Sequence, residues 1–232
     1  MRIKDISFDS PQKNLDFDDI LLLLAEKHEA GECLRFWESP STFIVLGRIG
    51  KEDEDVDLGQ AQKDNIPVLR RSSGGGTVVQ GQGCLNYTLV LSKHNYQVLN
   101  DLRKSYAWIS EKVIGALESQ GIKAYFRPIS DLATGQNEKK FSGNAQKRGK
   151  NYILHHGTIL YSFDLSLISR YLKMPQDIPE YRKNRPHTDF VTNIPINPTA
   201  FKEALAGQFN LGLMPQPLTQ EELSFLKINY SK

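Results

Sequence analysis

The chain has 232 residues, of which 39% are hydrophobic, so it can build a sizeable core in one large domain or two small ones. Its 29 lysines and arginines nearly balance 27 aspartates and glutamates, and the net charge of +2 does not favour nucleic acid as a partner. No segment has the unbroken apolar length that a bilayer-spanning helix needs, so no membrane partner is expected. The two cysteines, Cys33 and Cys84, lack the spacing of a zinc site or a disulfide framework, and a reducing, cytoplasmic setting is expected.

The first 91 residues are predicted to hold two helices and four strands. From Leu15 the sequence opens with acidic residues, continues with an apolar block and stops at Gly31, which is typical of a helix. The stretch CLRFWESPSTFIVLGR alternates apolar and polar residues around a Ser-Pro-Ser turn and predicts a hairpin. A short helix over residues 56–64 and strands over residues 66–69 and 85–91 follow.

The rest of the chain is predicted to hold helices, short strands and one long loop. Apolar residues recur at three- and four-residue intervals over residues 98–121, which predicts a helix. Strands are expected over residues 124–126, 141–146 and 153–161, and helices near residue 164, over residues 199–206 and after the capping-box sequence at residues 219–222. Residues 174–198 are rich in proline and charge and predict an irregular surface loop. This order without regular β-α alternation indicates an α+β fold with a mixed or largely antiparallel sheet.

The glycine-rich stretch RRSSGGGTVVQGQGCLNY, residues 70–87, is the first candidate site. Three glycines without Cβ atoms let backbone N–H groups approach a ligand closely. Strand alternation should turn only one of Arg70 and Arg71 towards such a ligand. The same residues would also suit a tight strand connection with solvated arginines. The nucleotide motifs GxxxxGK[ST] and GxGxxG and the hydrolase motifs HExxH and GxSxG do not occur.

The second candidate site is KKFSGNAQKRGKNYILHHGTIL, residues 139–160. Lys140 precedes Ser142 and Gly143, where exposed amides and the ammonium group could hold an anionic or carbonyl group. The alternative is a solvated surface lysine. His155 and His156 are neighbours in a predicted strand, so one should face inward and the other outward. The alternative is one core histidine and one surface histidine.

Three separated blocks, RRSSGGGTVV with GCLNYTLVLS, KKFSGNAQ and LHHGTIL, occur in an order and spacing that resembles the lipoate-protein ligase A family of the biotin/lipoate ligase superfamily. LRFWESPSTFIVLGR and the VTN at residues 191–193 support the resemblance, which covers most of residues 34–193. It implies a biotin/lipoate ligase catalytic fold of the α+β class, related to class II aminoacyl-tRNA synthetases. We expect one catalytic domain over residues 1–232, without a full-size C-terminal accessory domain.

The resemblance implies a cytoplasmic enzyme that activates lipoate with ATP and Mg²⁺ to lipoyl-AMP and passes the lipoyl group to a lysine of a lipoyl domain. Acceptors of this kind include E2 subunits of 2-oxoacid dehydrogenases and the glycine cleavage H protein. Lys140 is the expected catalytic residue, in contact with the lipoate carboxyl and the α-phosphate. Asp131 is a candidate for metal or adenine-side contacts. The other expected lipoate- and adenylate-binding residues are Arg70, Ser72, Gly74, Gly75, Gly76, Thr77, Val78, Asn86, Ser142, Gly143, Ala145, His156, Gly157 and Thr158.

An apolar tunnel for the lipoyl tail would be lined by Phe43, Val45, Leu46 and Val78, unless these are plain core residues. Two departures from the family pattern stand out. Gln80 replaces a histidine that many ligases carry, and HTDFVTN replaces an arginine-containing segment.

Several alternatives stay open at this point. Related octanoyltransferases and amidotransferases hold the acyl group on a cysteine, in one branch within the loop before the lysine motif, but the corresponding RPISDLATGQNEKK has none. An acyltransferase would need Cys84 or Cys33, and a small buried role suits Cys84 better. About forty residues follow Asn193, too few for an accessory domain. The chain is then a compact ligase, or it needs a separate accessory protein, or it transfers preformed lipoyl-adenylate.

Two further alternatives are an acyl- or nucleotide-binding regulator without turnover and a biotin ligase. The presence of Lys140 argues against the first. The second usually carries a GRGRxGR-type loop, which is absent here. The basic run over residues 139–150 is explained by the ligand site or a solvated turn, so nucleic-acid binding is not expected.

Overall fold

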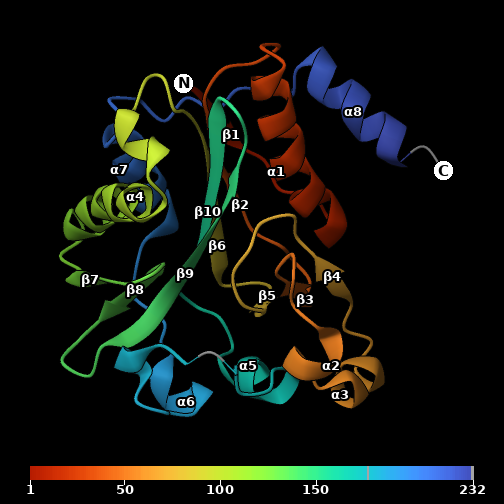
Figure 1. Ribbon diagram of the computed structural model, residues 1–232, viewed down its shortest axis with the longest axis vertical. Coiled ribbons are helices and arrows are strands. Elements are labelled where there is room, and N and C mark those ends of the chain that lie inside the picture. Colours follow the sequence, from red (N-terminus) through yellow and green to blue (C-terminus); the bar gives the residue numbers. More distant parts are fainter. Residues whose placement is uncertain (177, 231–232) are drawn as a thin grey trace.

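A mixed sheet of seven strands forms the centre of the molecule, whose computed structural model describes residues 1–176 and 178–230 (Figure 1). In spatial order the strands are β1 (Arg2–Asp5), β2 (Cys33–Trp37), β6 (Cys84–Ser92), β10 (Tyr152–Leu160), β9 (Lys139–Arg148), β8 (Asp131–Thr134) and β7 (Ala124–Arg127). β1 and β2 run parallel, and the remaining neighbours in this sheet run antiparallel. The predicted α+β fold with a largely antiparallel mixed sheet is therefore confirmed.

A second, small sheet consists of β3 (Phe43–Leu46) between β4 (Val68–Arg70) and β5 (Val78–Gln80). This arrangement overturns the predicted hairpin, because β2 pairs with β1 and β6 whereas β3 pairs with β4 and β5. Every residue of β2 and β3 is buried, so each strand is covered on both faces and belongs to the core of its own sheet. The Ser-Pro-Ser turn redirects the chain from one sheet to the other.

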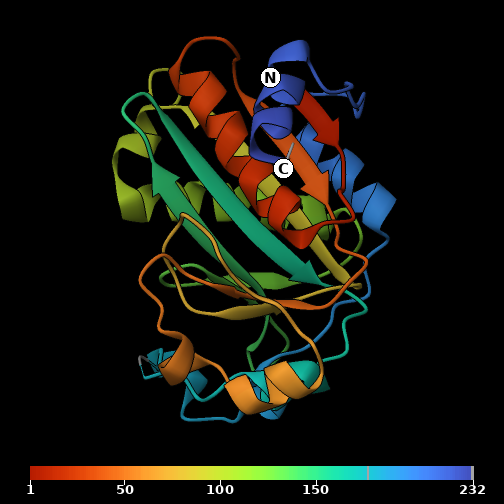
Figure 2. The same ribbon diagram turned by 90° about the vertical axis from the view of Figure 1, so that its right-hand side faces the viewer.

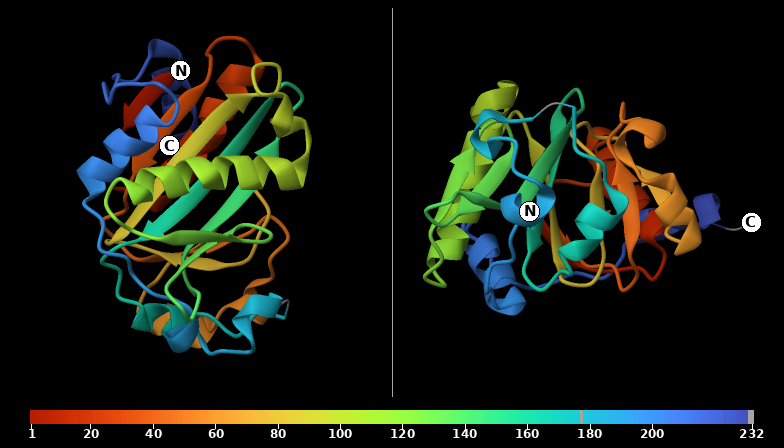
Figure 3. Two further views of the ribbon diagram at one scale, coloured as in Figure 1. Left: turned by 90° about the vertical axis from the view of Figure 1, so that its left-hand side faces the viewer. Right: turned by 90° about the horizontal axis from the view of Figure 1, so that it is seen from below.

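Helices cover both faces of the large sheet. α1 (Pro11–Glu26) crosses one face (Figure 2), and α4 (Leu102–Glu118) crosses the other (Figure 3, left). α1 shares a buried cluster with residues of β2, β6 and β10, and α4 shares another with α7 (Pro198–Gly207) and the opposite sheet face. No helix within the described ranges is long and apolar enough to span a membrane.

Side-chain caps set where the two long helices begin. Ser10 accepts a hydrogen bond from the backbone N–H of Lys13, and Pro11 occupies the first turn, so α1 begins earlier than predicted. The predicted helix over residues 98–121 is divided. Its first part is a short 3₁₀ helix (Gln97–Asn100), and α4 starts only after Asp101, whose carboxylate accepts from the backbone N–H of Lys104 at 2.8 Å.

The short helices lie together at one end of the molecule (Figure 1). They are α2 (Glu52–Asp55), α3 (Leu58–Lys63), α5 (Ser166–Tyr171), the 3₁₀ helix η2 (Glu180–Arg182) and α6 (His187–Phe190). The last two lie inside the segment predicted as an irregular loop, which is largely what it is. We call residues 172–176 and 178–193 the strap. They lie between α5 and the start of β9, where the N–H of Thr192 donates to the carbonyl of Lys140 at 2.9 Å.

The C-terminal helix α8 (Gln220–Tyr230) packs against α1 and begins with the predicted capping box. The Thr219 hydroxyl accepts from the N–H of Glu222 at 3.3 Å, and the Glu222 carboxylate accepts from the N–H of Thr219 at 2.9 Å. The same carboxylate is fully buried and pairs with Lys4 at 2.8 Å and Arg2 at 2.7 Å. This buried ion cluster ties α8 to β1.

Candidate active site

Two adjoining cavities border the glycine-rich segment and the start of β9. The smaller has a volume of about 140 Å³ and the larger about 930 Å³. Nine residues line both: Gly76, Thr77, Val78, Gln80, Ser130, Asp131, Lys140, Gly143 and Thr158. A ligand with two unlike halves could therefore occupy both cavities while its middle contacts these residues.

The smaller cavity has an apolar part, formed by Leu15, Trp37, Val45 and Val78. Of the four residues expected to form an acyl tunnel, Val45 and Val78 lie in its wall, whereas Phe43 and Leu46 are buried in two separate apolar clusters. The indole N–H of Trp37 is buried without a hydrogen-bond partner among the described residues.

The larger cavity is enclosed partly by the strap. Its wall includes the cationic side chains of Lys173 and Arg182 and the ring of His187, together with Phe190 and Val191. Desolvation by burial, followed by Arg182 and Lys140 nearby, keeps the pKa of His187 below its ordinary value despite a hydrogen bond to the Lys173 carbonyl. The wall of this cavity carries three cationic side chains, Lys140, Lys173 and Arg182, and three carboxylates, Asp55, Asp131 and Glu180, so any attraction for anions is local to the cations.

Lys140 is in the wall of both cavities and not on a solvated face. Its ammonium nitrogen lies 2.8 Å from Oδ1 of Asp131, and its side chain is 27% exposed. The other carboxylate oxygen of Asp131 accepts a hydrogen bond from the hydroxyl of Tyr181, in the strap, at 2.7 Å. Burial and the Asp131 charge raise the pKa of that hydroxyl, so Tyr181 stays neutral and donates. Asp131 lies in β8, although the sequence predicts a loop there.

The glycine loop, residues 71–77 between β4 and β5, closes over the smaller cavity. Gly75 has φ +84°, which a residue with a Cβ adopts only under strain. The loop also comes so close to β3 that a Cβ on Gly47 would lie 1.9 Å from the carbonyl oxygen of Gly75. Glycine is therefore required on both sides of this contact.

Arg71, rather than Arg70, borders the smaller cavity. Its guanidinium group donates to the carbonyls of Gly74 at 2.7 Å and Gly76 at 2.8 Å, and burial lowers its pKa to about 10. Arg70 turns away and donates to the carbonyls of Gly47 and Gly50 at 3.0 and 2.7 Å. Strand alternation does separate the two arginines, as expected, but the one that lines a cavity is Arg71, whereas the family resemblance implied Arg70.

The two histidines face opposite ways, as the strand alternation predicts. His156 lines the smaller cavity, with Nε2 2.7 Å from the Ser73 hydroxyl. His155 is fully buried among Gln146, Asn144 and aromatic rings, and burial lowers its pKa to about 3. Its Nδ1 lies 3.1 Å from the Gln146 amide nitrogen and its Nε2 3.2 Å from the Asn144 oxygen, so a neutral ring satisfies both contacts.

Most of the residues expected at the site lie in a cavity wall, and a few do not. Arg70, Ser72 and Gly74 line neither cavity; the Ser72 hydroxyl is bonded to Asp19 instead, so their contribution to ligand binding stays a prediction. The wall also contains residues that were not predicted for it: Leu15, Trp37, Arg71, Gln80, Ser130, Asn144 and the strap. Trp37 could have been predicted from the sequence, because it belongs to LRFWESPSTFIVLGR, a segment that supports the family resemblance.

Gln80, noted above as a departure from the family pattern, has a defined position. Its amide nitrogen donates to the Thr158 hydroxyl at 2.7 Å and its amide oxygen accepts from Asn86 at 3.1 Å. Thr158 in turn donates to the Asn86 amide oxygen at 2.6 Å. These three polar side chains are hydrogen-bonded to one another in a closed group. Gln80 and Thr158 line both cavities, and Asn86 lines the smaller one.

Neither cysteine is placed for covalent chemistry. Cys33 and Cys84 are fully buried free thiols and line neither cavity. Burial raises the pKa of Cys33 to about 12 and raises that of Cys84 as well, so neither forms a thiolate readily. No cluster of three or more His, Cys, Asp or Glu side chains suited to a metal ion occurs in residues 1–176 and 178–230.

Comparison with known proteins agrees with this arrangement. Residues 10–210 match the family model described as lipoyl protein ligase A/B catalytic domain. A probable lipoate-protein ligase A of Mycoplasma pneumoniae is 32% identical over 164 residues, which are 71% of this chain and 46% of the relative. An octanoyltransferase LipM of Oceanobacillus iheyensis is 25% identical over 233 residues, 90% of this chain and 85% of that protein. The chain spans about half the length of the lipoate-protein ligase A relatives from Mycoplasma pneumoniae and Mycoplasma genitalium that it matches.

Two solved structures show the same fold. A lipoate-protein ligase A bound with ATP has a TM-score of 0.78 at 23% identity, over 100% of this chain and 94% of the other. A bi-partite lipoate protein ligase of Thermoplasma acidophilum, described with its E2 lipoyl domain, has a TM-score of 0.75 at 21% identity, over 100% and 92%. The family match over residues 10–210, on a molecule with this fold and these two cavities, leads to one conclusion: the chain belongs to the lipoyl protein ligase A/B catalytic domain family.

Proposed function

We propose that the chain is a lipoate-protein ligase, which activates lipoate with ATP to lipoyl-AMP and transfers the lipoyl group to a lysine of a lipoyl-domain protein. The observation that carries this proposal is the position of Lys140 in the wall shared by two unlike cavities. The partly apolar cavity suits an acyl tail. The larger cavity has room for a nucleoside triphosphate, and Lys173 and Arg182 in its wall can pair with phosphate oxygens.

Both steps of this reaction develop negative charge near Lys140. In the first, a carboxylate oxygen of lipoate attacks the α-phosphorus of ATP, and the bond to pyrophosphate breaks. In the second, the acceptor lysine amine attacks the acyl carbon, loses a proton, and AMP leaves with the bridging oxygen. A fixed ammonium group beside the shared wall stabilises the charge on phosphoryl and carbonyl oxygens in both transition states. No enzyme nucleophile is needed, in keeping with two buried cysteines.

Mg²⁺ would have to arrive mainly on the phosphates of ATP. The described residues form no cluster of carboxylates, histidines or thiols for an ion, and both oxygens of Asp131 already have partners in Lys140 and Tyr181. Magnesium sites with few protein ligands and several substrate oxygens are common in enzymes that use nucleotides. Three carboxylates, Asp55, Asp131 and Glu180, line the larger cavity and would be the protein groups available to such an ion.

The runner-up is transfer without activation. The octanoyltransferase relative and the bi-partite ligase both match nearly the whole chain, which supports either an acyltransferase or a catalytic subunit that needs a separate accessory protein. A thioester mechanism lacks an accessible thiol in either cavity wall. Dependence on an accessory protein is compatible with the single catalytic domain that we propose for this chain.

The acceptor we propose is a lipoyl domain, such as that of a 2-oxoacid dehydrogenase E2 subunit or a glycine cleavage H protein. The bi-partite ligase of Thermoplasma acidophilum, described with its E2 lipoyl domain, supports this class of partner. We place the reaction in the cytoplasm, since free thiols suit a reducing compartment.

The test mixes purified protein, lipoate, ATP, Mg²⁺ and a lipoyl domain, and follows the acceptor by mass spectrometry. We expect a mass gain of one lipoyl group that requires ATP. Gain only from synthetic lipoyl-AMP would assign a transfer-only role that needs an activating partner. Gain only from an octanoyl thioester would assign the acyltransferase, and no gain from any donor would remove the proposal.

A further inference from the structure

Two neighbouring aspartates of α1, Asp18 and Asp19, are each connected to one of the two neighbouring serines of the glycine loop. The loop lies more than fifty residues further along the chain, so the connection is purely tertiary. Successive residues on a helix point about 100° apart. Asp18 accordingly points into the sheet and is 2% exposed, whereas Asp19 lies at the edge of the helix beside the loop.

The outer connection is direct. The Ser72 hydroxyl donates to Oδ1 of Asp19 at 2.5 Å, and the ammonium group of Lys147 in β9 lies 2.9 Å from the same oxygen. A hydrogen bond to a charged carboxylate is stronger than one between neutral groups. This contact therefore joins three separate elements, α1, β9 and the loop, at one oxygen atom.

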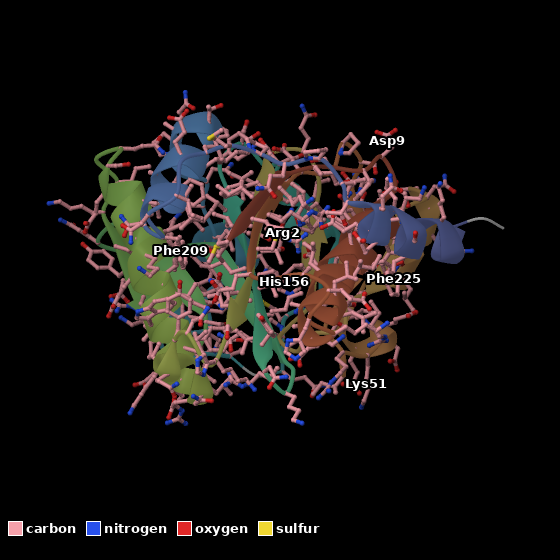
Figure 4. The ribbon with its side chains drawn as sticks, turned by 90° about the horizontal axis from the view of Figure 1, so that it is seen from above. Arg2, Asp9, Lys51, His156, Phe209 and Phe225 are labelled. Carbon is pink, nitrogen blue, oxygen red and sulfur yellow. The ribbon has the colours of Figure 1, made fainter. Side chains whose placement is uncertain are left out.

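The inner connection runs through His156, which lies near the middle of the molecule (Figure 4). Its Nε2 is 2.7 Å from the Ser73 hydroxyl and its Nδ1 is 3.4 Å from Oδ2 of Asp18. The Ser73 oxygen already accepts from Nε of Arg71 at 3.1 Å, so its proton is free to point at His156. Nε2 is then the acceptor, and Nδ1 carries the proton that faces Asp18.

This geometry has the order of a Ser-His-Asp triad, but Ser73 cannot act as a nucleophile. Its residue is 1% exposed, and it lines neither cavity. Its backbone is also fixed, because the carbonyl of Ser73 accepts from the N–H of Arg48 at 2.8 Å. A hydroxyl that no ligand reaches can still hold the loop in place, and that is the role the contacts fit.

We propose that Asp18 and Asp19 act as positioning residues, which hold the glycine loop in its ligand-binding shape through Ser73 and Ser72 before any ligand arrives. The inference rests on the proposed function only in taking the smaller cavity as the acyl site. Glycine backbones lose more conformational entropy on ordering than others, so a loop with three of them would weaken binding unless something else ordered it first. The hydrogen bonds of Ser72 and Ser73 hold the loop in one conformation, and the three glycines that follow can therefore stay in the sequence.

The experiment measures backbone hydrogen exchange of residues 71–80 in the ligand-free protein, together with lipoate affinity by calorimetry and the melting temperature. Asp19→Ala, Ser72→Ala and Ser73→Ala should each speed exchange and weaken lipoate binding by about ten-fold. The double serine variant should be affected more than either single one, whereas Asp19→Ala combined with Ser72→Ala should be no worse than Ser72→Ala alone. Ser72→Thr keeps the hydroxyl and should behave as the wild type. Matched controls are Ser39→Ala, which removes a buried hydroxyl from the turn after β2, and Asp16→Asn, which removes a charge from α1.

Wild-type exchange in the double variant, or equal effects of Ser72→Ala and Ser72→Thr, would overturn the proposal. So would an acyl group found on Ser73 after incubation with an activated octanoyl ester, because a nucleophile must be accessible. The exchange measurement needs neither ATP nor turnover. If the protein bound no lipoate at all, the proposed function would fall, while the exchange rates would still decide whether α1 holds the loop.

Discussion

The ammonium group of Lys140 and the carboxylate of Asp131 form an ion pair 2.8 Å long between the neighbouring antiparallel strands β9 and β8. Both residues of the pair line both cavities. The second carboxylate oxygen of Asp131 accepts a hydrogen bond from the hydroxyl of Tyr181 in the strap. Asp131 therefore holds the ammonium group of Lys140 in place. Under the function proposed above, the carboxylate of lipoate or a phosphate of ATP would compete with Asp131 for this group.

Removal of that cation should abolish activation. Lys140→Ala is expected to lower the rate of pyrophosphate release by at least about 100-fold, the usual effect of losing one fixed charge-stabilising group. Circular dichroism should show an unchanged fold, because the side chain is partly exposed in a cavity wall. Lys139→Ala is the matched control, because Lys139 is the preceding residue on the same strand and lines neither cavity. Unchanged turnover in Lys140→Ala would rule out the role given to this residue.

The Tyr181 hydroxyl should affect turnover without affecting the acyl site. Tyr181→Phe removes one hydrogen bond to Asp131 and keeps the ring on Phe190, 5.2 Å away between ring centres. We expect kcat for adenylate formation to fall about five-fold, equivalent to roughly 1 kcal/mol, with lipoate affinity unchanged. Tyr125→Phe on β7 is the control. An equal loss in both variants would remove any specific role for the strap contact.

The Asp18–Arg35 pair should govern stability at low pH. Burial alone would raise the pKa of Asp18, but Arg35 at 2.6 Å and His156 bring it below its usual range. Since the folded pKa is depressed, the stabilisation is complete well above pH 4 and is lost as the pH falls through that folded value. Asp18→Ala should lower the free energy of unfolding by about 3–5 kcal/mol at pH 7.

Urea titrations of both proteins between pH 7 and pH 3 would check this. The wild type should lose stability more steeply than Asp18→Ala in the acid range, because only the wild type has this carboxylate to protonate. Parallel curves would show that Asp18 contributes nothing to the acid dependence.

A methyl group at Gly47 should displace the glycine loop. Its Cβ would fall 1.9 Å from the Gly75 carbonyl oxygen, a contact that only backbone movement can relieve. We expect Gly47→Ala to raise KM for lipoate about ten-fold or more. Gly59→Ala is the control, because its Cβ would meet only a carboxylate oxygen 3.5 Å away. Wild-type KM in Gly47→Ala would mean that the loop shape does not matter for binding.

Substitution of the two cysteines would distinguish a ligase from an acyltransferase that works through a thioester. Cys33→Ala and Cys84→Ala remove buried thiols outside both cavities, so kcat/KM for lipoyl transfer should change by less than about two-fold. Each variant should cost about 1 kcal/mol of stability for the lost buried sulfur. Loss of transfer in a variant that folds, with an acyl thioester on the same residue in the wild type, would support the runner-up function.

The strands that carry the conspicuous sequence blocks, β6, β9 and β10, are predicted better than the strands around them. β6, β9 and β10 carry blocks with long alternating or apolar runs, and each lies where the pattern indicates. β1 and β8, four residues each, are too short for a period-2 pattern to be distinct. The hairpin prediction was wrong because β2 and β3 are joined by a suitable turn, and only the rest of the fold decides that they enter different sheets.

The candidate site shows the same division. Lys140, His156 and the glycines could be named from local patterns, because residue type and strand alternation decide which way a side chain points. Alternation could not decide between Arg70 and Arg71, since it gives a relative direction and no absolute one. The contacts of Asp18, Asp19 and Tyr181 join segments 50 or more residues apart, and no local pattern carries such information.

The burial of both native thiols makes the chain a ready background for spectroscopic labels. A cysteine introduced at Ile178, 37% exposed in the strap, would be the most reactive thiol in the protein. A fluorophore or spin probe attached there would report, in real time, whether the strap changes position when ATP is added.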